Sequence, residues 1–226
     1  MLYLIGLGLN ESGFSYEAFS AIKNSRAVYL ENYTVDFPYE KQKLEELIQK
    51  KIKDADRDFV ENFEILNEAK TQNTALLVYG SPLTATTHIS LLQESRKRKI
   101  AFRVIHSASI FDAVAGTGLQ IYKFGKTASI PKHEASSYLD IIEENKKINA
   151  HTLVLVDIGM ELKDSIKKLK GISGKIILCS SLGTKNQKIF YSEVKKLSKE
   201  KITKPYCFVI PGKLHFMEEE YLKNFS

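Results

Sequence analysis

The feature that most constrains the fold is a regular alternation of short apolar runs with longer amphipathic stretches. The runs are rich in β-branched and aliphatic residues, as buried strands are, and the stretches between them space their apolar residues as helices do. Seven runs predict strands: "LYLIGLGL", "AVYLE", "TALLVYG", "IAFRVI", "HTLVLVDI", "KIILCS" and "YCFVIPG". Eight stretches predict helices, at about residues 15–24, 40–52, 61–72, 87–99, 109–116, 136–148, 161–170 and 190–199. The pattern indicates an α/β chain with mainly parallel sheets.

The segment "GTGLQIYKFGKTASI", residues 116–130, interrupts this alternation with three glycines near the middle of the chain. Alternation of strands and helices resumes after it, as expected when a hinge separates two domains. We therefore expect an N-terminal α/β domain over residues 1–122 and a C-terminal α/β domain over residues 123–226.

The composition is that of an ordinary soluble globular protein, with 43% hydrophobic and 27% charged residues in 226. The formal net charge is +6, and the lysines are spread along the chain. The densest basic cluster, "SRKRK" at 95–99, ends a helical pattern and is better explained as a helix C-terminus than as a nucleic-acid patch. Basic surface can still steer an acidic partner.

Two observations bear on the compartment. Cys179 and Cys207 lie beside strand-like runs, which favours buried reduced thiols in a cytoplasmic protein and leaves a disulfide open. The start "MLYLIGLGL" lacks a preceding basic region and a following cleavage site, so it predicts a strand and not a signal peptide. No apolar run approaches the roughly 18 residues that a membrane span needs. We expect no membrane partner.

The first glycines raise the question of a dinucleotide site. In "LYLIGLGLNESG", Gly6 and Gly8 match the fingerprint G-x-G-x-x-G, but Glu11 stands at its third glycine and would crowd the turn and repel a pyrophosphate. Glu31 does lie about 20 residues further on, where a ribose-binding acid is expected. The broken motif favours a tight glycine turn that ends a strand.

Two polar loops follow neighbouring strands. "LVYGSPLTATTH", residues 77–88, leads from a strand through a proline turn into a helix, and Thr86 or Thr87 is expected to cap that helix. "VIHSASIFDAV", residues 104–114, repeats the arrangement, with Ser109 and Asp112 in a capping-box-like pattern. Both loops also suit a ligand crevice, because open α/β sheets bind ligands at the carboxyl ends of their strands.

Several reaction classes find no support. The five histidines show no H-E-x-x-H spacing and no C-x-x-C partner, so we expect no metal site. The chain also lacks the G-x-S-x-G elbow of serine hydrolases and the G-x-x-x-x-G-K-[ST] loop of P-loop NTPases.

A family resemblance ties these motifs together. The ordered segments "MLYLIGLGL", "GSPLTATTH", "IHSASIFDAVAGTGLQIYKFGKTASI", "HTLVLVDI" and "FVIPGKLHFMEEEYL" resemble archaeal diphthine synthases, in the tetrapyrrole methylase-like group (class III) of S-adenosylmethionine-dependent methyltransferases. The resemblance spans nearly the whole chain. It implies two α/β domains with a cleft between them for S-adenosyl-L-methionine, S-adenosyl-L-homocysteine as product, and a cytoplasmic homodimer that does not bind nucleic acid. Its implied substrate is the amino group of a modified histidine on translation elongation factor 2, during diphthamide biosynthesis.

The resemblance also implies which residues contact the cofactor. They are Leu9, Ser81, Thr84, Ser109, Ile110, Val156, Ser181 and Tyr206. Two depart from the usual pattern of relatives, since Ser81 stands where an aspartate is usual and Tyr206 where a histidine is usual. A serine hydroxyl accepts a hydrogen bond but supplies no charge to pair with the cofactor's ammonium or sulfonium.

No catalytic side chain can be named. A sulfonium methyl is already an activated electrophile, so the enzyme mainly has to align it with an unprotonated amine and exclude water. Two alternatives stay open: a small-molecule or tetrapyrrole methyltransferase of the same fold, and an inactive nucleotide-binding or scaffold protein, which only Ser81 favours.

Overall fold

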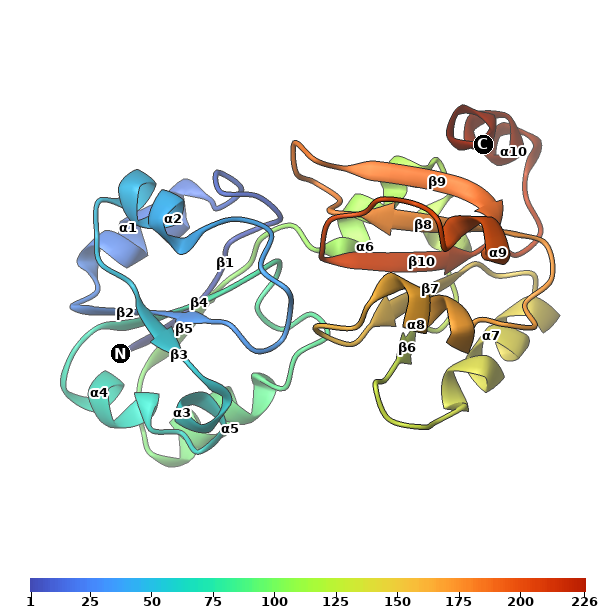
Figure 1. The fold of residues 1–226 in the computed structure, drawn as a ribbon. Coiled ribbons are helices and arrows are strands. Elements are labelled where there is room, and N and C mark those ends of the chain that lie inside the picture. Colours follow the sequence, from blue (N-terminus) through green and yellow to red (C-terminus); the bar gives the residue numbers. More distant parts are fainter. The chain divides into compact units, whose positions relative to one another are not determined.

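The computed structural model describes all of residues 1–226, which divide into two compact units, Met1–Ile110 and Phe111–Ser226 (Figure 1). The division falls ahead of the boundary expected near residue 122, because the glycine-containing segment packs inside the second unit. There the Gln120 amide donates to Glu218 Oε1 over 2.9 Å. A Cβ at Gly118 would lie 2.1 Å from the ring of Tyr221, so this segment and the C-terminal helix are in close contact.

Unit 1 is a three-layer α/β structure. Its strands are β1 (Leu2–Gly6), β2 (Ala27–Glu31), β3 (Lys53–Ala55), β4 (Thr74–Val78) and β5 (Phe102–Ile105). They form a fully parallel sheet in the order β3-β2-β4-β1-β5. The helices are α1 (Tyr16–Asn24), α2 (Lys41–Ile48), α3 (Arg57–Glu61), α4 (Ile65–Thr71) and α5 (Ile89–Lys97).

The helices of unit 1 cover both faces of its sheet. One buried cluster joins α1 and α2 to the sheet, and a second joins α3, α4 and α5 to the opposite face (Figure 1). Ala18, Ala21 and Ile22 show how α1 contributes, since they recur at helical spacing and are buried, while Ser15 caps the helix by accepting from the Ala18 amide. Coverage on both faces explains why β1, β2 and β4 are apolar along almost their whole length.

Unit 2 is built on a mixed sheet. Its strands are β6 (Ala128–Ile130), β7 (Thr152–Val156), β8 (Lys175–Ser180), β9 (Lys188–Glu193) and β10 (Tyr206–Ile210). Their order is β6-β7-β10-β8-β9, and only the β6–β7 pair is parallel. The helices are α6 (Ile110–Ala113), α7 (Ser137–Lys147), α8 (Leu162–Lys168), α9 (Val194–Leu197) and α10 (Phe216–Leu222), with 3₁₀ turns η1 (Val114–Thr117), η2 (Ile121–Lys123) and η3 (Lys223–Phe225).

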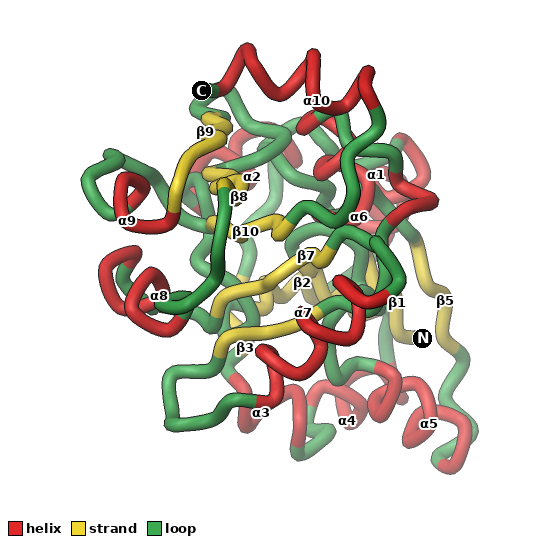
Figure 2. The backbone as a smooth tube through the Cα atoms, turned by 90° about the vertical axis from the view of Figure 1, so that its right-hand side faces the viewer, coloured by secondary structure: helices red, strands yellow, loops and turns green.

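One face of this sheet carries the hydrophobic core that it shares with α7, α8 and α9. Ile142 of α7, Ile166 of α8 and Leu197 of α9 are buried against Leu178 and Phe208 of the central strands. Figure 2 shows α8 and α9 next to each other at this face. The outward surfaces of α8 and α9 carry the exposed side chains of Lys163, Lys167, Lys195 and Lys196.

The α/β class is confirmed, and the mainly parallel sheet is confirmed for unit 1 alone. The helix expected at 190–199 is partly wrong, since residues 190–193 belong to β9 and only Val194–Leu197 are helical. The reason is tertiary: β9 pairs with the edge of β8 along six residues, which half-buries Phe190 and Tyr191.

The two cysteines face each other across β8 and β10 as buried free thiols, as expected from the sequence. The hydrogen bond to Cys207, together with burial, raises the pKa of the Cys179 thiol. None of the helices combines the length and the apolar character needed to cross a bilayer.

Candidate functional site

The turn after β1 is closed by glycine backbone. Gly8 has a φ of +70° and forms an isolated antiparallel bridge with Gly80, which follows β4. Each amide donates to the other residue's carbonyl, over 3.2 Å from Gly8 and 2.9 Å from Gly80. A Cβ at Gly6 would lie 2.6 Å from the Gly80 carbonyl oxygen, and one at Gly8 would lie 2.7 Å from that of Gly13. The two strand ends can meet this closely because these positions lack side chains.

Leu9 follows this turn and is held in place by burial and by a hydrogen bond. Its side chain is buried, and its carbonyl accepts a hydrogen bond from the Tyr79 hydroxyl over 3.0 Å. Burial raises the pKa of Tyr79, so the hydroxyl remains a proton donor at neutral pH. The Tyr79 ring also packs edge-on against Phe37, with 5.6 Å between centroids.

The Gly-Ser-Pro-Leu loop after β4 is held by its own carbonyl groups. The Thr84 amide donates to the Ser81 carbonyl over 3.1 Å. The Pro82 carbonyl accepts from Thr86 Oγ1 over 2.9 Å and lies 3.0 Å from His88 Nδ1. Since a carbonyl oxygen only accepts, Nδ1 of the buried His88 carries a proton. Ser81 is buried in this loop with its carbonyl engaged.

The capping role predicted for Thr86 or Thr87 is wrong. Helix α5 begins at Ile89, and the His88 side chain before it makes no capping hydrogen bond. Thr86 bonds within the loop, and the Thr87 hydroxyl donates to Glu61 over 3.3 Å. The threonine hydroxyls therefore hold the loop and do not cap the helix.

The loop after β5 lies against the other two. The Ser107 hydroxyl donates to the Gly13 carbonyl over 3.0 Å. A Cβ at Gly6 would lie 3.1 Å from Cβ of Ser107, and one at Gly80 would lie 3.9 Å from Cα of Ser109. Ser109 is buried, and Ile110 begins α6 directly after it. The structure thus brings Leu9, Ser81, Thr84, Ser109 and Ile110 to one edge of the unit 1 sheet, as the parallel strands predict.

Glu31 does not support a dinucleotide site. Its carboxylate is buried, accepting from the Tyr33 amide over 3.1 Å and from the Thr34 hydroxyl over 2.8 Å. These bonds engage both carboxylate oxygens in the turn that follows β2. Glu31 is therefore occupied within its own turn, and the ribose-binding role considered from the sequence has no other residue to support it.

The three predicted residues of unit 2 also lie at one sheet edge. Val156 ends β7, Ser181 directly follows β8, and Tyr206 begins β10 between these two strands. Ser181 has a left-handed backbone with φ of 48°, and its hydroxyl lies 2.7 Å from Thr203 Oγ1. Its hydroxyl also donates to the Thr203 carbonyl over 3.1 Å, so the Ser181 side chain is engaged by the segment before β10.

The Tyr206 side chain points into unit 2. Its hydroxyl donates to the Met160 carbonyl over 3.2 Å and to Ser165 Oγ over 3.0 Å. The ring stacks edge-on against Phe208, with 5.8 Å between centroids. Tyr206 therefore packs beneath α8.

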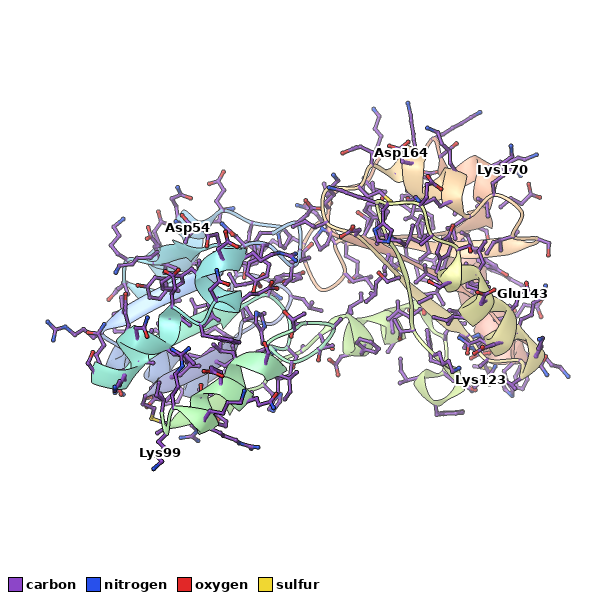
Figure 3. The ribbon with its side chains drawn as sticks, turned by 90° about the horizontal axis from the view of Figure 1, so that it is seen from below. Asp54, Lys99, Lys123, Glu143, Asp164 and Lys170 are labelled. Atoms are coloured by element: carbon purple, nitrogen blue, oxygen red, sulfur yellow. The ribbon has the colours of Figure 1, made fainter.

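Residue-level prediction missed a buried ionic network that anchors the C-terminal helix. Glu218 accepts from the His215 amide over 2.7 Å and pairs with Lys123, which is labelled in Figure 3. His151 Nε2 lies 3.1 Å from Glu218 Oε1, and the Gly212 amide donates to His151 Nδ1 over 2.9 Å. Lys123 comes from "YKFGK", Gly212, His215 and Glu218 come from "PGKLHFME", and His151 begins "HTLVLVDI", so three segments of the family resemblance meet here.

The protonation states in this network follow from geometry. The Gly212 amide occupies Nδ1 as a donor, so His151 is neutral and donates through Nε2 to Glu218. Burial lowers the pKa of His151. Burial alone would raise the pKa of Glu218, but hydrogen bonds from the His215 amide, Lys123 and the Gln120 amide hold that pKa at about 2. Lys123 is thus the cation that balances the Glu218 carboxylate.

The structure brings together no group of three or more histidine, cysteine, aspartate or glutamate side chains that could hold a metal ion. The absence of a metal site stays a prediction.

Comparison with known proteins shows the family of the chain. Residues 1–198 match the family of Tetrapyrrole (Corrin/Porphyrin) Methylases. A diphthine synthase from Methanocaldococcus jannaschii is 35% identical across 99% of this chain and 98% of its own length. A diphthine methyl ester synthase from Schizosaccharomyces pombe is 43% identical across 71% of this chain and 59% of its own length. A crystal structure of diphthine synthase matches 100% of this chain and 95% of its own, with a TM-score of 0.93 and 30% identity.

The chain therefore belongs to the tetrapyrrole (corrin/porphyrin) methylase family, and is a methyltransferase. Relatives that match it over nearly their full length include diphthine synthases, which confirms the resemblance seen in the sequence.

Proposed function

We propose that this methyltransferase transfers the methyl group of S-adenosyl-L-methionine to the amino group of a modified histidine on translation elongation factor 2, in diphthamide biosynthesis. The observation that carries the proposal is similarity over the full chain to diphthine synthases, in sequence and in fold. The full-length relatives are named for diphthine, which favours this substrate over a tetrapyrrole or another small molecule.

The residues at the two sheet edges would hold the cofactor. Those of unit 1 are Leu9, Ser81, Thr84, Ser109 and Ile110, and those of unit 2 are Val156, Ser181 and Tyr206. The fit is supported at unit 1, where Ser81 is buried with its carbonyl engaged by Thr84, so its hydroxyl is the group left to meet a ligand. At unit 2 the hydroxyls of Ser181 and Tyr206 are engaged, so contacts there would use main-chain atoms.

Methyl transfer from a sulfonium requires that the reacting groups be positioned, and it depends less on acid or base side chains. S-adenosyl-L-methionine supplies an activated methyl group and becomes S-adenosyl-L-homocysteine. The protein has to align the amine lone pair with that methyl carbon and exclude water. The amine must also be unprotonated, and a site of low polarity would lower its pKa. No side chain is assigned the role of general base.

The decisive experiment incubates the protein with S-adenosyl-L-methionine and elongation factor 2 that carries the unmethylated intermediate. The mass of the histidine peptide is then measured, and a gain of methyl mass is expected. An unchanged mass would contradict the proposal. A parallel calorimetric titration should show binding of S-adenosyl-L-methionine and none of NAD, whereas binding of neither would favour an inactive scaffold.

A second candidate product is a methyl ester on the same residue. It is favoured by the 43% identity to a relative named diphthine methyl ester synthase. The same peptide distinguishes the two outcomes, because mild alkali hydrolyses an ester and leaves methylated amines intact. Loss of a methyl mass after alkali would show esterification.

We also infer a homodimeric enzyme of the archaeal type that works in the cytoplasm. Free buried thiols at Cys179 and Cys207 are consistent with a reducing compartment. Exposed apolar side chains on α10, among them Phe216 and Met217, offer a surface for self-association. Sedimentation of the purified protein tests the dimer directly.

A further inference from the structure

The net positive charge of the chain lies entirely in unit 2. Unit 1 has fourteen basic and fourteen acidic residues, whereas unit 2 has nineteen basic and thirteen acidic residues. The formal charge of +6 is therefore the charge of residues 111–226 alone. A one-sided field of this kind is not needed for solubility, which an even distribution would also give, so it points to a partner of opposite sign.

Within unit 2 the surplus is concentrated in the stretch from Glu161 to Lys204. This stretch contains twelve lysines and four acidic residues. Its helices α8 and α9 pack on the same face of the sheet through Leu162, Ile166, Val194 and Leu197, and Lys163, Lys167, Lys195 and Lys196 on these helices are exposed. Six exposed lysines on α8, on α9 and in the segment directly after α9 define what we call the lysine face: Lys163, Lys167, Lys195, Lys196, Lys199 and Lys201.

Figures 2 and 3 place this surface. Figure 2 shows α8 and α9 together at one side of the unit 2 sheet, and contacts between these two helices confirm that they are neighbours. Figure 3 shows Asp164 of α8 and Lys170, which follows α8, at the outer rim of unit 2.

Most of these charges are not neutralised within the protein. Lys167 pairs with Asp164 over 2.8 Å, and Lys204 pairs with Glu161 over 2.8 Å. These two pairs occupy half of the four acidic residues in the stretch. Lys195 and Lys196 extend from a helix whose only buried residues are Val194 and Leu197, and neither lysine forms an ion pair. Repulsion between unpaired like charges in an exposed cluster is mildly unfavourable for the isolated protein. Binding of an anionic surface relieves this repulsion.

One end of the lysine face adjoins the cofactor edge of the same unit, while α9 lies towards the opposite end of the sheet, because it follows Glu193, which pairs with Lys175 at the start of β8. Tyr206 bonds to Met160, which precedes α8, and to Ser165 inside it. The segment that carries Lys199 and Lys201 continues to Thr203, whose carbonyl accepts from Ser181. A macromolecule that covers the whole lysine face would therefore reach the edge formed by Val156, Ser181 and Tyr206.

From this juxtaposition we infer that the lysine face binds an acidic surface of the protein substrate and so brings the residue to be methylated to the cofactor edge. The inference rests on the proposed function, because it takes the substrate to be a protein. Exposed lysines steer such encounters over about one Debye length, roughly 8 Å at physiological ionic strength. RNA is the less suitable partner, because the exposed aromatic residues of unit 2 that would stack on bases lie on α6, η2 and α10 and not on α8 or α9: Phe111, Tyr122, Phe216 and Tyr221.

The test measures methyl transfer to elongation factor 2 that carries the unmethylated intermediate. The concentration of this protein substrate and the ionic strength are both varied. The variant is Lys195→Glu with Lys196→Glu, and Lys195→Gln with Lys196→Gln is a milder second variant. The matched control is Lys43→Glu with Lys70→Glu, the same change of charge at exposed, unpaired lysines of unit 1. Calorimetric titration with S-adenosyl-L-methionine reports whether the site of each variant is intact.

We expect KM for the protein substrate to rise about tenfold in the Glu variant and less in the Gln variant, with kcat and cofactor affinity unchanged. The salt dependence of KM should also weaken in both, and the control should behave as the unaltered protein. An unchanged KM and salt dependence in both variants would overturn the inference while leaving the proposed function in place. Salt-dependent binding of RNA that the Glu variant weakens, without any change in KM, would overturn it in favour of a nucleic acid. Absence of methyl transfer by the unaltered protein would overturn both proposals.

Discussion

The Glu218 carboxylate is buried against the neutral His151 imidazole, with Oε1 3.1 Å from Nε2. The two residues are 67 positions apart, and Lys123 completes the network from a third segment. The network fastens the start of α10 to β7 and to η2, because Glu218 also accepts from the His215 and Gln120 amides. A buried carboxylate with this many donors stabilises the fold only while it is ionised.

We expect Glu218→Gln to lower the free energy of unfolding by about 3 kcal/mol, since it leaves the partly buried Lys123 without its counter-charge. Urea unfolding followed by circular dichroism measures this loss. The control is Glu219→Gln, the same change at the exposed neighbouring residue, with an expected effect below about 0.5 kcal/mol. Equal losses in the two variants would show that the network contributes nothing.

Stability should also fall as the solution becomes acidic, in two steps. The folded-state pKa of His151 is lowered below 6.5, so the unfolded chain binds this proton first, and stability declines as the pH falls below about 6.5. The pKa of Glu218 is lowered from 4.5 to about 2, so its contribution is complete above about pH 4.5 and is lost towards about pH 2. Unfolding midpoints in urea across this range should show both steps, and His151→Gln should remove the first one. A flat profile between about pH 7 and about pH 5 would contradict the assignment of His151.

Some elements could be predicted from the sequence because local pattern and tertiary environment agree. "AVYLE" and "KIILCS" coincide with β2 and β8, whose residues are almost all buried. By contrast, β3 has three residues, two of them exposed and charged, and β9 is an edge strand with half-buried side chains. Such strands are fixed by pairing with a neighbour, which short-range pattern does not report.

The same distinction applies to the candidate site. The meeting of the loops after β1, β4 and β5 follows from the parallel order of the strands, so the positions of Ser81 and Ser109 could be anticipated. The direction of the Tyr206 side chain could not, because it is set by Met160 and Ser165, which lie more than forty positions earlier in the chain. The helix cap expected at Thr86 failed for a similar reason, since its hydroxyl bonds to the Pro82 carbonyl.

The glycine at position 8 should tolerate no side chain. Gly8→Ala combines a left-handed backbone with a Cβ 2.7 Å from the Gly13 carbonyl oxygen, and we expect a loss of at least about 2 kcal/mol in unfolding free energy. Gly174→Ala is the control, because Gly174 also has a positive φ, of +86°, but has open space around it, and its cost should be about 1 kcal/mol. Similar losses in both variants would mean that the close approach of the β1 turn adds nothing.

His88 should act on the Gly-Ser-Pro-Leu loop through the Pro82 carbonyl. We expect His88→Leu to weaken S-adenosyl-L-methionine binding about tenfold, because the loop that carries Ser81 loses a hydrogen bond at 3.0 Å. Calorimetric titration gives the affinity, and Gln93→Leu, at an exposed position of α5, should leave it unchanged. The loop does not depend on His88 if both variants bind the cofactor equally well.

Ser81 should face the cofactor, and its replacement tests this most directly. Ser81→Asp supplies the carboxylate that the family resemblance implies at this position. We expect affinity for S-adenosyl-L-methionine to be retained or to rise by up to about tenfold, since a charged acceptor binds an ammonium more strongly. Ser81→Phe should abolish binding, because a phenyl group would fill the space beside the Gly80 backbone. Ser90→Phe, at an exposed serine in the first turn of α5, is the control and should bind normally.

Calorimetric titration measures the cofactor affinity of all three variants, and urea unfolding confirms that each is folded. Normal affinity in folded Ser81→Phe would remove Ser81 from the cofactor site, and the missing carboxylate would then have no bearing on binding.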